Sequence, residues 1–203
     1  MPYYQDIITT KSFKILQDLK RNYNFILIGG WAVFLHTQKL KSKDIDIIVD
    51  YAELEKLRKK FSLNKNERLK KYEIQLEQTD IDIYLPHYSD LKIPLEEIKQ
   101  YTTNIEGFII LKPEILLILK QTAFSDRQGS NKGEKDKIDI ISLVNMDNFD
   151  FNLYQKILKK YNLENYQKEL IDLLKSVNEV FELWLNQYQY SKLKKKILKL
   201  LKK

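Results

Sequence analysis

The segment from Gly29 to Val49, GGWAVFLHTQKLKSKDIDIIV, constrains the fold of this chain more than any other part. A short apolar run, Phe25 to Ile28, has the length of a buried strand and ends at Gly29-Gly30. A helix over residues 31–38 is predicted to leave directly from the glycines, and Ile45 to Val49 is predicted to return as a second strand. Strand, paired glycines, helix and strand in this order predict an α/β core.

The glycines and the helix start form a candidate anion site. Glycine allows a phosphate to approach the backbone closely. The first turn of a helix offers unpaired N–H groups and a partial positive charge to an anion. We therefore expect Gly29 and Gly30 to lie beside a bound phosphate group.

Asp44 and Asp46 form a candidate magnesium site on the second strand. Side chains two residues apart on a strand point to the same face. Two carboxylates so close repel each other unless cations lie between them, and oxygen ligands are those that Mg²⁺ prefers. Because the pattern DIDI also occurs at residues 80–83, an ordinary pair of polar strand residues is the alternative interpretation.

A third carboxylate is expected from the alternating segment 80–85, which pairs in the prediction with segment 73–78 as an antiparallel hairpin. If this strand lies beside that of Asp46, Asp82 completes a two-metal site that activates an attacking hydroxyl. Asp80 remains its competitor for this role.

The rest of the chain divides into an α/β part and a helical part. An amphipathic helix is predicted at residues 10–23, a surface helix at 52–61 and a last strand at 105–111. Pro113 is predicted to open a helix. The polar stretch 125–137 is predicted to be a loop, and the remainder to be helical. The fold class is thus α/β (α+β), with a mixed sheet core at residues 1–112 and a C-terminal helical bundle at 113–203.

Lys120 lies on an apolar arc of its predicted helix, beside Leu116 and Phe124. A lysine in such a place costs free energy unless an anion meets it, and a phosphate or an aspartate would serve. The alternative is a buried stem whose ammonium reaches water. Asp136 either orients Lys120, acts as a base or forms a structural salt bridge, and Arg127 either closes over a triphosphate or keeps its loop soluble.

The pattern of apolar strand, Gly-Gly, helix and Asp-x-Asp resembles the nucleotidyltransferase superfamily with a DNA-polymerase-β-like fold. The GGWA opening is similar to lincosamide and aminoglycoside nucleotidyltransferases. The segment ILKPEILLILKQTAFSDRQGSNKGEKDKIDIISLV resembles the end of the AbiEii-type family, which includes toxins that add nucleotides to transfer RNA.

The resemblance implies that Gly29 and Gly30 flank a triphosphate and that Lys120 and Asp136 complete the site. Ser42, two residues before Asp44, also matches. Leu40 stands where many relatives have an arginine.

The resemblance further implies a Mg²⁺-dependent transfer of NMP from an NTP to an acceptor hydroxyl, with RNA such as a transfer RNA 3′ end as acceptor. A toxin–antitoxin pair with a cognate antitoxin protein is one implied context. A small-molecule acceptor of the antibiotic type and a non-catalytic nucleotide-binding or interaction module are the alternatives.

Composition agrees with this class without selecting within it. The formal net charge of +7 comes mainly from lysine and would attract phosphates, although a lysine-rich heat-adapted surface gives the same charge. The chain has no cysteine, no run of apolar residues long enough to span a membrane and no secretion signal, so we expect a cytoplasmic protein without a membrane partner. The lysine-rich end, residues 191–203, is predicted to be a helix with one apolar stripe.

Overall fold

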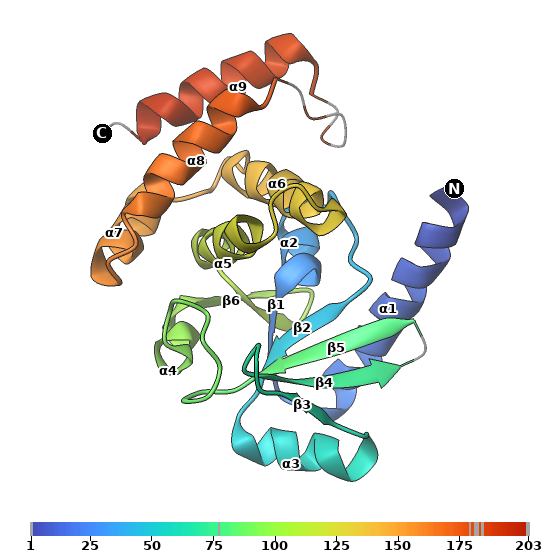
Figure 1. Cartoon of the computed structure of the whole chain (residues 1–203). Helices are drawn as coiled ribbons and strands as arrows, with labels where there is room; N and C mark the ends of the chain where they lie inside the picture. Colours follow the sequence, from blue (N-terminus) through green and yellow to red (C-terminus); the bar gives the residue numbers. More distant parts are fainter. Residues whose placement is uncertain (1, 77, 179, 181–182, 184, 202–203) are drawn as a thin grey trace. The chain divides into compact units, whose positions relative to one another are not determined.

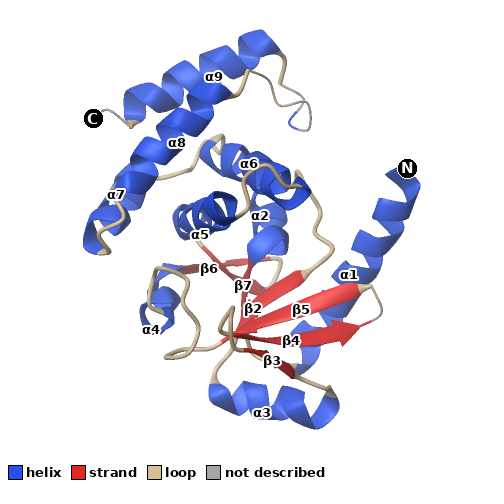
Figure 2. Cartoon of the chain, in the orientation of Figure 1, coloured by secondary structure: helices blue, strands red, loops and turns tan. Residues whose placement is uncertain are grey.

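The computed structural model of the chain describes residues 2–201 except 77, 179, 181, 182 and 184 (Figure 1). The chain forms two compact units, Met1–Lys112 and Pro113–Lys203. Figure 2 shows that the strands belong to the first unit, whereas helices make up most of the second.

The N-terminal unit is built on a mixed sheet. Within the described residues, seven strands pair in the order β3-β4-β5-β2-β1-β7-β6. Their bounds are β1 (Ile26–Ile28), β2 (Ile45–Ile48), β3 (Asn64–Asn66), β4 (Lys71–Leu76), β5 (Thr79–Tyr84), β6 (Thr102–Ile105) and β7 (Phe108–Leu111). The pairs β1–β7 and β2–β5 are parallel, and the other neighbours are antiparallel.

The helices of this unit are α1 (Pro2–Asn22), α2 (Gly29–Thr37), α3 (Tyr51–Lys60) and the short α4 (Leu95–Ile98), followed by the 3-10 turn η1 (Lys99–Tyr101). Helix α2 packs on β1 and β2. Asp50 caps α3 by accepting a hydrogen bond from the backbone N–H of Glu53. The alternating side chains of β2 and β5 that face away from the aspartates, such as Ile45, Ile47 and Ile81, are fully buried and form the core.

Three features of local structure in this unit differ from the predictions. The segment 105–111 was expected to be one strand, but β6 and β7 form a hairpin around Glu106 and Gly107, which both have positive φ. The side chain of Asn104 accepts a hydrogen bond from the N–H of Gly107 and stabilises this turn. Helix α1 also begins well before residue 10, and β3 was not predicted, because its sequence is polar.

The C-terminal unit is helical. Its helices are α5 (Pro113–Asp126), α6 (Asn131–Val144), α7 (Phe151–Lys160), α8 (Asn165–Ser176) and α9 (Gln187–Leu200). Tyr154 and Tyr190 are its largest fully buried side chains, and Gln121 accepts a hydrogen bond from the Tyr154 hydroxyl within this core. In α9, Ile197 is buried, as the predicted apolar stripe requires, while Lys202 and Lys203 lie outside the described residues.

The predicted loop at residues 125–137 is wrong over most of its length. Helix α5 continues to Asp126, and α6 begins at Asn131 with Ser130 accepting a hydrogen bond from the N–H of Gly133. Gly133 does not break the helix. A Cβ atom there would lie 2.4 Å from the carbonyl oxygen of Arg127, so glycine is needed where the two segments pass close to each other.

None of the helices in the described part of the chain is long and apolar enough to cross a membrane.

Candidate active site

The junction between β1 and α2 requires glycine for two reasons. Gly29 has φ +66°, a conformation that side chains with a Cβ atom rarely adopt. A Cβ atom on Gly29 would also lie 2.0 Å from Oδ2 of Asp46, and one on Gly30 would lie 2.8 Å from Oγ of Ser42. The glycines therefore leave room for the polar side chains of the neighbouring loop and strand. This requirement was not foreseen from the sequence, which suggested only the approach of a phosphate.

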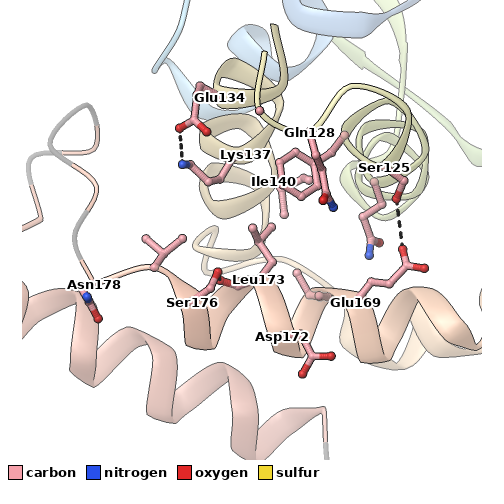
Figure 3. A pocket seen from close by; sticks show the side chains of 15 residues that line it. Ser125, Gln128, Glu134, Lys137, Ile140, Glu169, Asp172, Leu173, Ser176 and Asn178 are labelled. Atoms are coloured by element: carbon pink, nitrogen blue, oxygen red, sulfur yellow. Dashed lines mark hydrogen bonds and ion pairs between the residues drawn. The ribbon is translucent and has the colours of Figure 1, made fainter. Parts of the chain in front are cut away.

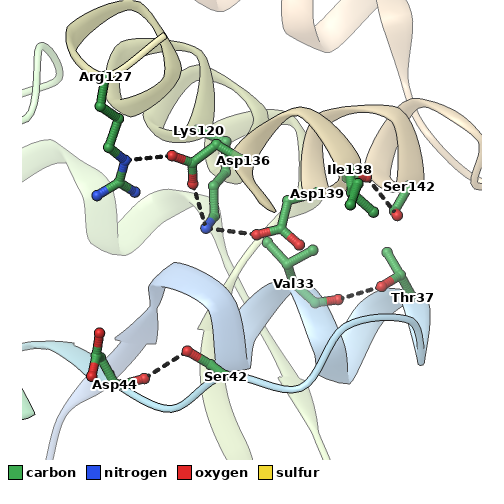
Figure 4. Close-up of polar contacts among 10 residues, drawn as sticks. All are labelled: Val33, Thr37, Ser42, Asp44, Lys120, Arg127, Asp136, Ile138, Asp139 and Ser142. Carbon is green, nitrogen blue, oxygen red and sulfur yellow. Dashed lines mark hydrogen bonds and ion pairs between the residues drawn. The ribbon is translucent and has the colours of Figure 1, made fainter. Parts of the chain in front are cut away.

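Ser42 shapes the loop that leads into β2. Its hydroxyl donates a hydrogen bond of 2.8 Å to the backbone carbonyl of Asp44 (Figure 4). Asp44 is half-buried, and its Oδ1 atom is shielded from solvent. The loop thus places Asp44 at the start of β2, two residues before Asp46.

Three acidic residues form one line across the sheet, which we call the acidic row: Glu73 on β4, Asp82 on β5 and Asp46 on β2. Asp82 is the register partner of Asp46 across the parallel pair and of Glu73 across the antiparallel pair. Residues directly opposite each other in neighbouring strands place their side chains on the same face, where like charges destabilise the sheet. The sequence suggested Asp46 and Asp82 but not Glu73.

Lys71 contacts two members of the acidic row. Its Nζ atom lies 2.5 Å from Oδ2 of Asp82 and 3.0 Å from Oε1 of Glu73. The Lys71 side chain is only 12% exposed. Burial lowers the pKa of Lys71, but the hydrogen bonds and charges of Asp82 and Glu73 outweigh it, so the net change is a raised pKa.

Asp82 has a raised pKa. Burial is the main cause, the negative charges of Glu73 and Asp44 add to it, and Lys71 opposes it. The influence of Asp44 indicates that this carboxylate shares the electrostatic environment of the acidic row. Its competitor Asp80 is exposed and pairs in register with Gln75 on β4, outside the row.

The donor set of this region fits Mg²⁺, since Asp44, Asp46 and Asp82 offer carboxylate oxygens and Asp46 and Asp82 are register neighbours. Among the described residues, no three His, Asp or Glu side chains already stand in a geometry that could hold a metal ion. One oxygen of Asp82 is hydrogen-bonded to Lys71.

Two residues near the junction are structural. Trp31 is buried in the core, and its indole N–H donates a hydrogen bond of 2.9 Å to the Ser12 hydroxyl. Nε2 of His36 lies 2.8 Å from the backbone oxygen of Leu111, and burial lowers the pKa of this histidine.

The C-terminal unit contains a second charged group, which we call the Lys120 cluster: Lys120, Arg127, Asp136 and Asp139. Figure 4 shows the Lys120 ammonium between the two carboxylates, at 3.1 Å from Oδ1 of Asp136 and 2.7 Å from Oδ2 of Asp139. Nε of Arg127 lies 2.5 Å from Oδ2 of Asp136. The anion that the apolar surroundings of Lys120 require is therefore supplied by aspartates of α6.

Burial is deepest at the two aspartates of this cluster. The side chain of Asp136 is 2% exposed and that of Asp139 is 6% exposed. Burial raises the pKa of Asp139, although the Lys120 charge opposes this change. The contacts of Asp136 with both Lys120 and Arg127 favour the orienting or salt-bridging alternatives over a base. Asp139 was not among the predicted site residues, although its spacing from Asp136 on one helix face was the available signal.

A hollow of about 690 Å³ lies between α5, α6 and α8 in the same unit (Figure 3). Apolar side chains such as Ile140 and Leu173 line it together with the acidic residues Glu134, Glu169 and Asp172. An ion pair joins Glu134 to Lys137 at its rim. This lining is unlike that of a phosphate site, because the carboxylates outnumber the lysine.

The family model described as "nucleotidyltransferase of unknown function (DUF6036)" matches residues 7–197. The chain belongs to this family. The match covers both units, so the helical unit is part of the nucleotidyltransferase family's architecture and not an unrelated appendage.

Two solved structures from Helicobacter pylori agree with this fold. JHP933 from Helicobacter pylori is similar at 16% identity and a TM-score of 0.53, with 94% of each chain covered. A second H. pylori chain, described as a candidate nucleotidyltransferase, is similar at 18% identity and a TM-score of 0.52, with 97% of each chain covered. An antigenic nucleotidyltransferase-like protein from Paracoccidioides brasiliensis is similar at 21% identity and a TM-score of 0.45, with 89% of this chain and 98% of that chain covered. No curated protein sequence matches the chain.

The mixed sheet and the family match thus support the superfamily that the Gly-Gly and Asp-x-Asp pattern indicated. A special nearness to AbiEii-type or GGWA-type enzymes stays a prediction.

Proposed function

We propose that this protein transfers the nucleotidyl group of a nucleoside triphosphate to a hydroxyl group of RNA with the help of Mg²⁺. The observation that carries the proposal is the register pairing of Asp46 with Asp82. Asp46 itself follows Asp44 by two residues and lies beside the glycine-lined start of α2. Carboxylates held together against their mutual repulsion are typical of a site that binds divalent cations.

Asp44, Asp46 and Asp82 would hold the metal ions. The ions, when bound, neutralise the negative charge that develops on the triphosphate and lower the pKa of the attacking hydroxyl. Asp82 is preferred to Asp80 for this role because Asp80 is exposed and lies outside the acidic row.

The reaction exchanges one phosphorus–oxygen bond for another. The acceptor oxygen forms a bond to the α-phosphorus of the triphosphate, while the bond from this phosphorus to the pyrophosphate oxygen breaks. The hydroxyl proton passes to a carboxylate or to water. The protein's contribution is positioning and electrostatic stabilisation rather than covalent chemistry.

The triphosphate would be met by the N-terminal end of α2. This helix begins at Gly29 without a side-chain cap, and its first N–H groups and partial positive charge suit an anion. Ser42, which touches Gly30 and holds the backbone of Asp44, supports this arrangement from the adjacent loop. The roles that the resemblance implies for Lys120, Asp136 and Arg127 stay predictions.

RNA is preferred as the acceptor because the chain carries a net charge of +7 and its C-terminal helix exposes lysines. Lys192, Lys195 and Lys199 of α9 are all exposed. Such a surface attracts a phosphate backbone, and each contact with a phosphate makes binding more sensitive to salt.

The proposal is tested by incubating the protein with α-labelled nucleoside triphosphates, Mg²⁺ and total RNA. Label should appear in one or a few RNA species. We expect the rate of transfer to fall about a thousandfold or more in the Asp44→Asn/Asp46→Asn variant, because the proposed catalysis depends on metal ions that these carboxylates would hold.

Asp82 and Asp80 provide a matched pair of variants on one strand. Asp82→Asn should lose activity on the scale of the double variant, whereas Asp80→Asn should retain it. Unchanged transfer in the Asp44→Asn/Asp46→Asn variant would show that these carboxylates are not catalytic.

The same assay separates the alternatives. Label in a small hydroxyl compound, with none in RNA, would identify an antibiotic-type acceptor. Nucleotide binding without transfer to any acceptor would identify a non-catalytic module. The toxin role rests on the AbiEii-type resemblance alone, and growth arrest on expression that the double variant relieves would support it.

A further inference from the structure

Lys71 is placed where it can act on the proposed metal site. It is the first residue of β4 and lies two residues before Glu73, so both side chains are on one face of the sheet. Because Glu73 and Asp82 are register partners, the Lys71 ammonium reaches across to Asp82, at 2.5 Å, as well as to Glu73, at 3.0 Å.

The position of Lys71 follows from charge. The acidic row brings three carboxylates together. The Lys71 side chain is only 12% exposed, so its ammonium needs anionic partners to compensate for lost hydration. Asn66 on β3 donates a hydrogen bond of 3.0 Å to Oε1 of Glu73, the oxygen that Lys71 also contacts, and so helps to fix the position of this carboxylate. Lys71 is thereby held between Glu73 and Asp82 by contacts on both sides.

We propose that Lys71 is a built-in counter-ion of Asp82 that competes with a divalent cation for this carboxylate and so weakens metal binding in the absence of nucleotide. The inference rests on the proposed function, since it assumes that Asp82 is a metal ligand. It adds a positioning residue for which neither the family match nor the Asp-x-Asp pattern gives a role.

Two consequences follow from the Lys71 contacts. A cation that takes Oδ2 of Asp82 as a ligand must replace the hydrogen bond from Lys71 and meets the repulsion of its ammonium. The triphosphate brings further negative charge, so cation and nucleotide should bind together more favourably than the cation alone. Lys71 in this way links metal binding to the presence of substrate.

The inference is tested by titrating the full chain with Mn²⁺ in the absence of nucleotide and measuring free Mn²⁺ by electron paramagnetic resonance. Removing the ammonium in Lys71→Met should tighten Mn²⁺ binding about tenfold or more, because one positive charge leaves the immediate surroundings of the ligands. Lys71→Arg keeps the charge and should bind Mn²⁺ as the unchanged protein does.

Lys65→Met is the matched control. Lys65 lies on β3, opposite Tyr72 in register and therefore on the other face of the sheet from Lys71, and its ion pair is with the exposed Glu67. This variant should leave the Mn²⁺ affinity unchanged. If Lys71→Met does not fold, as judged by its circular dichroism, Lys71→Gln replaces it.

The outcomes separate this inference from the proposed function. If Asp44→Asn/Asp46→Asn abolishes Mn²⁺ binding while neither Lys71→Met nor Lys71→Gln tightens it, the role of Lys71 is overturned and the metal site stands. If the double aspartate variant binds Mn²⁺ as before, or if neither the unchanged protein nor the Lys71 variants bind it, the metal site itself fails, and the role of Lys71 with it.

Discussion

The acidic row of the sheet and the Lys120 cluster of the helical unit both bury carboxylates, but they balance charge differently. In the Lys120 cluster, two cations meet two carboxylates in direct contacts of 2.5–3.1 Å. In the acidic row, three carboxylates lie side by side in register, and the Lys71 ammonium contacts Glu73 and Asp82. The first arrangement surrounds buried carboxylates with cations of the fold, whereas a row of carboxylates in register offers several oxygen ligands on one face to a cation from solution.

The comparison also shows how each group depends on local geometry. The acidic row follows from strand register, because Glu73, Asp82 and Asp46 are consecutive partners across three strands. The Lys120 cluster follows from helix spacing, because Asp136 and Asp139 are three residues apart on α6. The first arrangement places like charges opposite each other, and the second surrounds one cation with anions.

The largest effect on stability is expected when the balanced cluster loses its central cation. Lys120→Met leaves Asp136 and Asp139 buried without this partner and should lower the free energy of unfolding by about 3–5 kcal/mol. Urea denaturation measures the change. The control is Lys137→Met on α6, the helix of Asp136 and Asp139. The partner of Lys137, Glu134, is exposed, so this variant should change stability by less than about 0.5 kcal/mol. Equal urea midpoints for Lys120→Met and Lys137→Met would contradict the view that Lys120 stabilises the fold by neutralising the buried aspartates.

An intermediate effect is expected at the glycine that supports the acidic row. Gly29→Ala combines a positive φ with a clash against the Asp46 carboxylate, so it should destabilise the fold by about 2–3 kcal/mol and weaken Mn²⁺ binding. Gly129 is the matched control, since it has φ +77° but no atom within 4 Å of an added Cβ. Gly129→Ala should cost only about 1 kcal/mol and leave Mn²⁺ binding unchanged. Thermal unfolding and Mn²⁺ titration of both variants separate the effect of the contact with Asp46 from the effect of positive φ. Equal losses of stability and of Mn²⁺ affinity in the two variants would show that the contact with Asp46 has no effect.

The smallest effect is a pH dependence in the balanced cluster. Burial raises the pKa of Asp139 in the folded state above its value in the unfolded chain, so the folded state binds this proton more tightly. The stability that this proton contributes is present at acid pH and is lost as the pH rises through the raised pKa. Asp139→Asn stays neutral, so its stability relative to the unchanged protein should increase as the pH rises from about 4 to 7. Urea midpoints measured across this range test the sign, and a relative stability that falls with pH would show that the Lys120 contact outweighs burial.

Several elements of the fold could be predicted from local patterns because their causes are local. The apolar run before Gly29, the alternation at residues 80–85 and Pro113 at the start of α5 each correspond to an element close to the expected position. A pattern that fits two kinds of structure was misinterpreted. Glycines and polar residues at 125–137 suggested a loop, whereas Ser130 is a helix cap and Gly133 permits a close backbone approach.

The candidate site divides in the same way. Asp44, Asp46, Gly29 and Gly30 stand out in the sequence, because their spacing alone puts them at a strand end and a helix start. Glu73 and Lys71 do not stand out, because they lie in an ordinary charged strand and acquire meaning only through register.

The sequence by itself determined the chemistry available here: a glycine-lined strand–helix junction and an Asp-x-Asp pair, both set by residues within about twenty positions of one another. Only the tertiary structure decided which further charges lie next to Asp46 across the sheet, namely Asp82 and not Asp80, with Glu73 and Lys71 beside Asp82. The physical reason is that Asp80 and Asp82 share one face of β5, so the spacing within the strand cannot separate them, and only the register between strands that are distant in the sequence sets which of them lies opposite Asp46.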